Sequence, residues 1–171
     1  MDEAIALLDA EGPEALSMRR LANRLGVSTM STYHHVAGKA DLVDGIAERI
    51  MGAMEVPPET VPWDEAVGTM ARSFRQLTWQ HPSAFRVLLG RERPAALVRT
   101  EDDVVARLVS AGFEPAEALT TFRIIVRFLL GSVMVEATPR RTRRELDATF
   151  EQGLAVLLAG VAARRAAGQP S

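Results

Sequence analysis

Apolar residues recur at intervals of three and four positions along almost the whole chain. In residues 39–54, for example, Leu42, Ile46 and Ile50 fall on one stripe of a helix. No stretch shows the strict alternation of apolar and polar residues that is typical of a β-strand. The pattern therefore predicts an all-α protein, with helices over residues 2–10, 18–24, 29–35, 39–54, 63–80, 82–90, 95–111, 115–137 and 143–166.

The clearest interruption of this helical pattern lies in residues 57–62, which contain three prolines. Proline has no backbone N–H and a fixed φ, so a cluster of prolines is typical of a linker. We therefore predict two domains, which comprise residues 1–56 and residues 57–171.

The first domain contains two short helices around a glycine turn. Ser17 and Ser28 each stand where a serine can cap the N-terminus of a helix, and Gly26 suits a left-handed stop between the helices. Val27 is apolar and is expected to pin the turn to the core. The segment therefore predicts a helix-turn-helix. The outward residues of its second helix are hydrogen bonders plus one flexible apolar side chain, namely Thr29, Met30, Ser31, Tyr33 and His34.

The charge pattern points to the same segment. Residues 17–39 contain Arg19, Arg20, Arg24 and Lys39 but no Asp or Glu, although acids flank the segment on both sides. The chain as a whole has a net charge of −2, so contact with a polyanion must be local. DNA binding is the favoured interpretation, and an ordinary helical hairpin with a solvated face is the alternative.

These residues resemble the DNA-binding domain of the tetracycline-repressor (TetR) family. The resemblance rests on the segments ALSMRRLA (residues 15–22), LGVS (25–28), YHHV (33–36) and GKADL (38–42). One departure is Thr32, where the family usually has an apolar residue, although a threonine methyl can pack there. Family members usually have a basic segment before the first helix, so the resemblance allows an extension before Met1.

The resemblance and the side-chain chemistry agree on the expected contacts with an operator. Tyr33 and Lys39 are expected to hold phosphates, with Ser17 or Arg19 contributing from the preceding helix. Thr29, Met30, Ser31 and His34 are expected to face the bases. The tetracycline repressor binds its drug with magnesium, partly through a histidine in the linking helix. The matching residue here is Glu55, which argues against carrying over tetracycline or magnesium.

Composition excludes several other classes. Cysteine is absent, no signal peptide is recognisable, and no uncharged apolar run is long enough to span a bilayer, so we expect a cytoplasmic protein that has no membrane partner. The adjacent His34 and His35 point in different directions on a helix and make a poor metal pair. Because no catalytic or phosphate-binding motif occurs, we predict neither an enzyme nor a cofactor or metal site.

The last two long helices are predicted to form a four-helix homodimer interface with the same helices of a second subunit. A palindromic operator also requires two-fold symmetry. The alternative is that both helices complete the core of a monomer. The apolar residues on which the prediction rests are Leu119, Phe122, Val126, Leu129, Leu130 and Val133, then Ile125, Phe128 and Val135, then Leu146, Phe150, Gly153, Leu154, Leu157, Leu158 and Val161.

The second domain is also rich in large apolar residues of the kind that line ligand pockets between helices. A packed core is the simpler interpretation of each one. The predicted ligand-binding residues are Met70, Phe74, Trp79, Phe85, Phe122, Ile125 and Phe128, with Met134 as a further candidate. Polar contacts are expected from Gln80, His81, Thr121, Arg123 and Arg127. The favoured alternative for His81, which precedes Pro82, is a helix-junction residue, and the two arginines are alternatively expected to pair with Glu136 or with acids elsewhere.

We therefore predict a repressor that binds a palindromic double-stranded DNA operator as a homodimer and is released by a small apolar or aromatic effector. One alternative is a constitutive DNA-binding regulator without a ligand. Another is a helical small-molecule-binding or interaction module that no longer binds DNA. A second basic cluster at residues 140–144 is expected to be a solvated loop, and a polyanion or acidic partner is the alternative.

Overall fold

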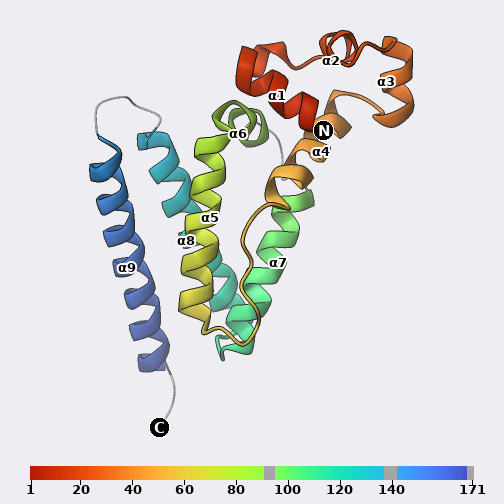
Figure 1. Cartoon of the computed structure of the whole chain (residues 1–171). Helices are drawn as coiled ribbons and strands as arrows, with labels where there is room; N and C mark the ends of the chain where they lie inside the picture. Colours follow the sequence, from red (N-terminus) through yellow and green to blue (C-terminus); the bar gives the residue numbers. More distant parts are fainter. Residues whose placement is uncertain (91–94, 137–141, 169–171) are drawn as a thin grey trace. The chain divides into compact units, whose positions relative to one another are not determined.

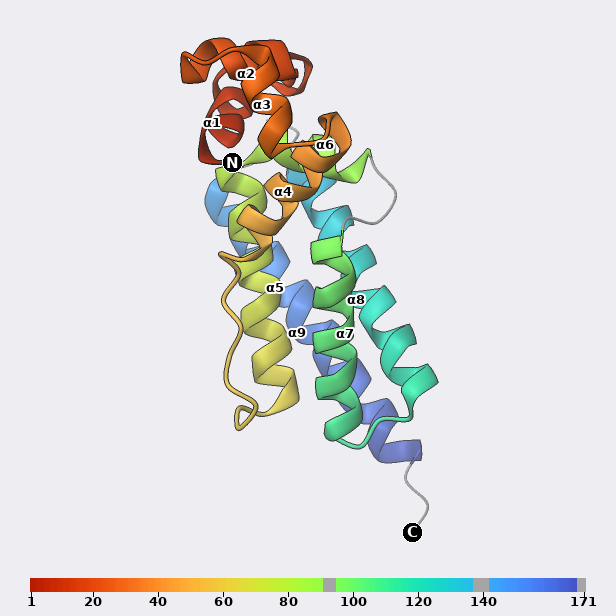
Figure 2. The same ribbon diagram turned by 90° about the vertical axis from the view of Figure 1, so that its right-hand side faces the viewer.

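The computed structural model describes residues 1–90, 95–136 and 142–168, and all regular structure in these ranges is helical (Figures 1 and 2). This confirms the predicted all-α fold. The elements are α1 (Asp2–Glu11), η1 (Pro13–Ala15), α2 (Met18–Leu25), α3 (Thr29–His35), α4 (Lys39–Met51), α5 (Trp63–Gln80), α6 (Pro82–Leu89), α7 (Ala95–Ser110), α8 (Pro115–Glu136) and α9 (Arg143–Gly168).

Among the helices before α9, the predicted and observed bounds differ most at the end of α4. The sequence pattern extends this helix to residue 54, but α4 ends at Met51. Beyond it, the amide of Ala53 donates to the carbonyl of Ile50 and that of Met54 to Met51, so the chain continues in tighter three-residue turns. The apolar stripe is therefore longer than the α-helix that carries most of it.

The chain forms two compact units, and neither is continuous in sequence. The first comprises Met1–Met54 and Gln76–Thr100, and the second comprises Glu55–Arg75 and Glu101–Ser171. Helices α5 and α7 thus each contribute to both units. The functional division between residues 1–56 and 57–171 remains a prediction, because residues 76–100 pack with the N-terminal helices.

Helix α6 joins the core of the first unit. It buries Ala84, Phe85 and Leu88 and contacts α1, η1 and α4. At its start, the Nδ1 atom of His81 lies 2.8 Å from a carboxylate oxygen of Asp9 in α1. This interaction places His81 at a helix junction, as its position before Pro82 predicts.

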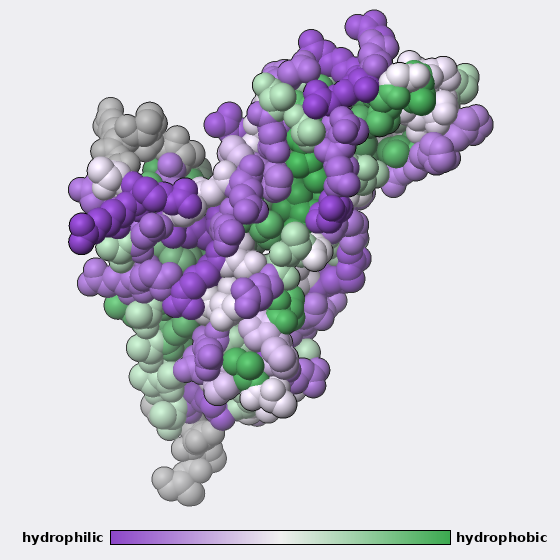
Figure 3. Space-filling model, viewed as in Figure 1, coloured by the Kyte–Doolittle hydropathy of each residue, from purple (hydrophilic) through white to green (hydrophobic). Residues whose placement is uncertain are grey.

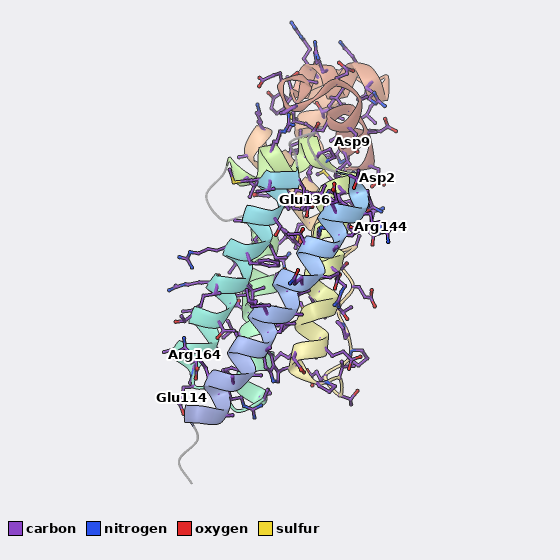
Figure 4. All side chains as sticks on the ribbon, turned by 90° about the vertical axis from the view of Figure 1, so that its left-hand side faces the viewer. Asp2, Asp9, Glu114, Glu136, Arg144 and Arg164 are labelled. Atoms are coloured by element: carbon purple, nitrogen blue, oxygen red, sulfur yellow. The ribbon has the colours of Figure 1, made fainter. Side chains whose placement is uncertain are left out.

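A buried ion cluster connects three helices of the second unit. The Nε of Arg75 in α5 donates to both carboxylate oxygens of Glu136 in α8, at 2.9 and 3.0 Å, and its Nη1 donates to Asp147 in α9 at 2.9 Å. The guanidinium lies 4.4 Å from the ring centroid of Phe150. Figure 4 shows Glu136 at the end of α8 that lies beside the start of α9.

This cluster corrects the predicted partners of Glu136. The sequence suggested Arg123 or Arg127, which share a face of the same helix. Instead, Nη1 of Arg127 donates to the carbonyl of Arg123, and the carboxylate of Glu136 turns to Arg75. The reason is burial, because the side chains of Arg75 and Glu136 are only 8% and 4% exposed, whereas Arg123 and Arg127 lie on the surface.

Candidate DNA-binding and ligand-binding sites

The turn between α2 and α3 has the predicted local structure. The hydroxyl of Ser17 accepts from the amide of Arg20 at 3.3 Å, and that of Ser28 accepts from the amide of Ser31 at 3.1 Å. Gly26 has φ 68° and ψ 27°, the left-handed conformation that glycine adopts without steric cost. Two capped helices around a left-handed glycine form the predicted helix-turn-helix.

The turn is anchored differently from the prediction. Val27 was expected to pack into the core, but it is 43% exposed, and its amide instead donates to the carbonyl of Ala22 at 3.0 Å. The anchors are Thr32 and Val36, which are both buried. The hydroxyl of Thr32 donates to the carbonyl of Thr29 at 2.6 Å, which satisfies its polar atom and leaves its methyl free to pack. Threonine therefore replaces the expected apolar residue without an unpaired hydroxyl.

The outward face of α3 presents the predicted side chains. Met30 is 71% exposed and Tyr33 is 49% exposed. His34 is also exposed, whereas Thr29 and Ser31 are partly buried. This face offers a thioether, a phenol, an imidazole and two hydroxyls to a partner.

The cations around this face divide into two kinds. Arg20 and Arg24 form ion pairs with Glu11 and Glu3, each at 2.9 Å. These acids lie outside residues 17–39, so the sequence pattern could not show that they are close in space. Arg19 and Lys39 are exposed and form no ion pair with the residues that the structure describes.

Lys39 is the first residue of α4, and a fixed loop precedes it. A carboxylate oxygen of Asp41 accepts from the amide of Ala37 at 2.9 Å. Ser17 is partly buried at the start of α2. All eight predicted DNA-contacting residues therefore lie at the surface of the first unit, on α2, α3 or the starts of helices that adjoin them.

The predicted ligand-binding residues are divided between the two compact units. Trp79 and Phe85 belong to the first compact unit, and the other five belong to the second. Within the second unit, Met70 and Ile125 are buried, while Phe74, Phe122 and Phe128 are partly buried. The sequence could not show this division because α5 continues without interruption from one unit into the other.

One cavity in the second unit includes a predicted residue. It has a volume of about 390 Å³ and lies between α8 and α9. Phe128 lines it together with Phe150, and their ring centroids are 5.5 Å apart. Phe150 was assigned to the association stripe, where its helical spacing gave no signal of a cavity. The remaining lining residues are Arg127, Gly131, Ser132, Val135, Glu136, Leu146 and Thr149.

Helices α8 and α9 pack closely within one protomer. A Cβ on Gly153 would lie 2.7 Å from Cε2 of Phe128, so the small residue permits the two helices to approach. Leu154 is completely buried in the same protomer. Leu154 was assigned to the association stripe, but a charge there would disrupt the protomer core and therefore cannot test the dimer separately.

A different face of these helices remains exposed. Val156 of α9 is 68% exposed, and Ile124, Met134 and Val135 of α8 are exposed as well. By length and composition alone, Pro115–Glu136 and Arg143–Ala166 are long and apolar enough to cross a membrane. Only 22% and 17% of their most apolar windows are buried in the protomer, and Figure 3 shows pale green apolar surface over the C-terminal half of α9.

The second basic cluster lies only partly within the described residues. Arg143 and Arg144 are exposed at the start of α9, whereas Arg140 and Arg141 lie outside the described residues. Among residues 1–90, 95–136 and 142–168, no group of three or more His, Cys, Asp or Glu side chains could hold a metal ion.

Comparisons with known proteins agree with this geometry. Residues 1–46 match the family described as "Bacterial regulatory proteins, tetR family", and residues 57–146 match the family "Tetracyclin repressor-like, C-terminal domain". The class A tetracycline repressor of Escherichia coli is 30% identical over 190 residues, covering 95% of this chain and 88% of that protein.

Two further proteins are similar. An HTH-type transcriptional regulator of Saccharopolyspora erythraea is 34% identical over 140 residues, which span 80% of this chain but only 59% of that protein. The crystal structure of TetR-Q116A from Acinetobacter baumannii AYE in complex with minocycline superposes with a TM-score of 0.81. It is 28% identical, and the match covers 96% of this chain and 94% of that one.

Proposed function

The chain belongs to the TetR family of bacterial transcription regulators, and from this premise we propose that it is a cytoplasmic, homodimeric repressor released from its operator by a small molecule. The observation that carries this proposal is the capped helix-turn-helix with an exposed polar face on α3.

We infer that the two cations of residues 17–39 without acidic partners hold the DNA backbone. Arg19 and Lys39 can each neutralise a phosphate, and the hydroxyls of Ser17 and Tyr33 can donate to phosphate oxygens. Thr29, Met30, Ser31 and His34 are proposed to face base edges in the major groove, where Met30 can contact thymine methyl groups. Arg20 and Arg24 are left out of this set because Glu11 and Glu3 already pair with them.

The effector is proposed to be aromatic and to bind in the C-terminal domain, residues 57–171. The minocycline complex of the Acinetobacter protein and the aromatic walls of the α8–α9 cavity support this choice. Helix α6 packs with α1 and α4. A conformational change in residues 76–100 can therefore be transmitted to the N-terminal helices through direct contacts. An effector can shift DNA affinity only if it binds the two states with different affinity.

A mobility-shift titration on DNA upstream of the protein's own gene tests the function. We expect retardation that is reversed by a member of a panel of polycyclic aromatic compounds that includes minocycline. Retardation that no compound reverses would favour a constitutive regulator. Absence of retardation at low salt would favour a helical module that no longer binds DNA.

Replacing Lys39 with alanine should weaken binding to all DNA sequences about equally and lower the slope of log K against log salt by about one, because one phosphate contact is lost. Fluorescence anisotropy at several salt concentrations measures both quantities. Arg49→Ala is the matched control, because Arg49 also lies on α4 but pairs with Asp2 at 2.7 Å. If Lys39→Ala and the wild type had equal affinity and equal slope, the proposal that the start of α4 lies at the DNA phosphate backbone would be contradicted.

Replacing Phe128 with alanine should reduce the effector-induced rise in Tm more than it reduces DNA binding by the free protein. The ligand stabilises the folded state by mass action, and Phe128 lines the proposed cavity. Thermal-shift measurements with and without effector, together with anisotropy, separate the two effects. Phe113→Ala serves as a control because Phe113 is buried outside this cavity. If Phe113→Ala, and not Phe128→Ala, selectively lost the effector-induced rise in Tm, the assignment of the effector to this cavity would be contradicted.

A further inference from the structure

A second cavity lies in the same unit as the first, and no predicted ligand-binding residue lines it. Its volume is about 760 Å³, which falls in the range typical of small-molecule pockets. One wall is formed by Pro57 and Pro58 of the linker between α4 and α5 together with Trp63, the first residue of α5, and α7 contributes Ala106 and Arg107. Arg165 of α9 completes it.

The linker wall is held in place by hydrogen bonds. Arg107 donates from Nη1 to the carbonyl of Pro58 at 3.0 Å and from Nη2 to that of Pro57 at 2.7 Å. At the start of the linker, the amide of Glu55 donates to the hydroxyl of Ser73 in α5 at 2.8 Å. Because prolines have a fixed φ and these carbonyls are paired, the cavity is formed before any ligand binds.

Among the described residues, Arg165 is positioned by its contacts with Phe113 and Gly112. Its guanidinium carbon lies 5.4 Å from the ring centroid of Phe113, and a Cβ on Gly112 would lie 3.2 Å from Nη2. Its Nε is buried without a hydrogen-bond partner, and the described residues place no carboxylate within ion-pair distance of its guanidinium. A partly buried cation without a counterion favours the binding of an anionic ligand, because charge-assisted hydrogen bonds to the ligand would offset the free-energy cost of desolvating the cation.

The aromatic wall is also preorganised. Trp63 meets Phe113 edge to face, with ring centroids 5.0 Å apart and an interplanar angle of 78°. Glu59 and Asp103 line the same cavity and are exposed, so a ligand with several negative charges would be repelled. The lining therefore favours one anionic group attached to an apolar, planar body.

We propose that this cavity binds a small aromatic monocarboxylate, with its carboxylate at the outer nitrogens of Arg165 and its ring beside Trp63. This site is separate from the effector residues proposed above and does not depend on DNA binding. A protein that failed to bind operator could still bind this ligand, so the two proposals fail independently.

Quenching of Trp63 fluorescence by 4-nitrobenzoate tests the proposal. The chain has two tryptophans, so a Trp79→Phe background leaves Trp63 as the only reporter. We expect saturable quenching, with affinity roughly tenfold higher than for the neutral isostere 4-nitrobenzamide, because the amide has no negative charge and only one acceptor oxygen for the guanidinium. Quenching that stays linear, or equal affinity for both compounds, would overturn the proposal.

Two variants locate the binding site. Arg165→Gln should weaken 4-nitrobenzoate binding roughly tenfold, whereas Arg164→Gln should leave it unchanged, since Arg164 lies 3.7 Å from Glu117 and does not line the cavity. Ala106→Phe, which fills the cavity without altering its charge, should abolish saturable quenching. Equal affinities for the two arginine variants, or full binding by folded Ala106→Phe, would rule the site out.

Discussion

Replacing Arg75 with methionine is expected to lower the free energy of unfolding by about 3–5 kcal/mol, because the carboxylate of buried Glu136 would lose its guanidinium partner. Asp147 is half-exposed and can return to water, so Glu136 accounts for most of the loss. Urea denaturation followed by circular dichroism, at one fixed protein concentration, measures the change. The double variant Arg75→Met/Glu136→Leu should recover most of the loss, because it removes both buried charges.

Arg72→Met is the matched control on the same helix. Arg72 makes an equally well-formed pair with Glu151, with three hydrogen bonds of 2.8–3.0 Å, but both side chains are about half-exposed. Such a pair contributes about 0–1 kcal/mol. If Arg72→Met destabilised the protein as much as Arg75→Met, burial would not be what distinguishes the two pairs.

The exposed pair should also show a small pH dependence. The hydrogen bonds from Arg72 hold the pKa of Glu151 below its ordinary value. Its contribution to stability is therefore present above the pKa of the unfolded chain and is lost as the pH falls through the lowered pKa of the folded state. Arg72→Met should remove this contribution.

The helices were predictable because their signals are local. Ser17, Gly26 and Ser28 act on residues three or four positions away, and all three have the predicted conformation or hydrogen bond. The apolar stripes likewise reflect one helix at a time. The predicted end of the helix in residues 39–54 was wrong, because an apolar periodicity does not distinguish an α-helix from the tighter turns that follow it.

The contacts between distant segments were not predictable from such signals. Glu136 pairs with Arg75, which is 61 residues away, and no local pattern distinguishes that arginine from Arg72. Arg24 likewise meets Glu3 across 21 residues, which changes which cations are available to DNA. The division of the predicted ligand-binding residues between the two units was not predictable for the same reason, since helical periodicity shows that a side chain is apolar but not which neighbour it meets.

The exposed apolar face of α8 and α9 predicts a large effect on dimer formation. We expect Val156→Asp to make the protein monomeric at micromolar concentration and to lower operator affinity by about two orders of magnitude or more. Val156 is 68% exposed in the protomer, so the substitution leaves the protomer core intact. In a two-fold interface it would place an aspartate on both subunits, where unpaired charges leave water at a cost of several kcal/mol.

Loss of the dimer lowers operator affinity because two linked heads bind with a high effective concentration that a single head lacks. Light scattering gives the mass, circular dichroism shows that the protomer remains folded, and fluorescence anisotropy gives the affinity. Val109→Asp on α7 is the control, because it introduces the same charge at an exposed apolar position outside α8 and α9. A Val156→Asp protein that stays dimeric would show that the subunits associate through another surface, and a monomeric wild type would remove the two-fold argument for a palindromic operator.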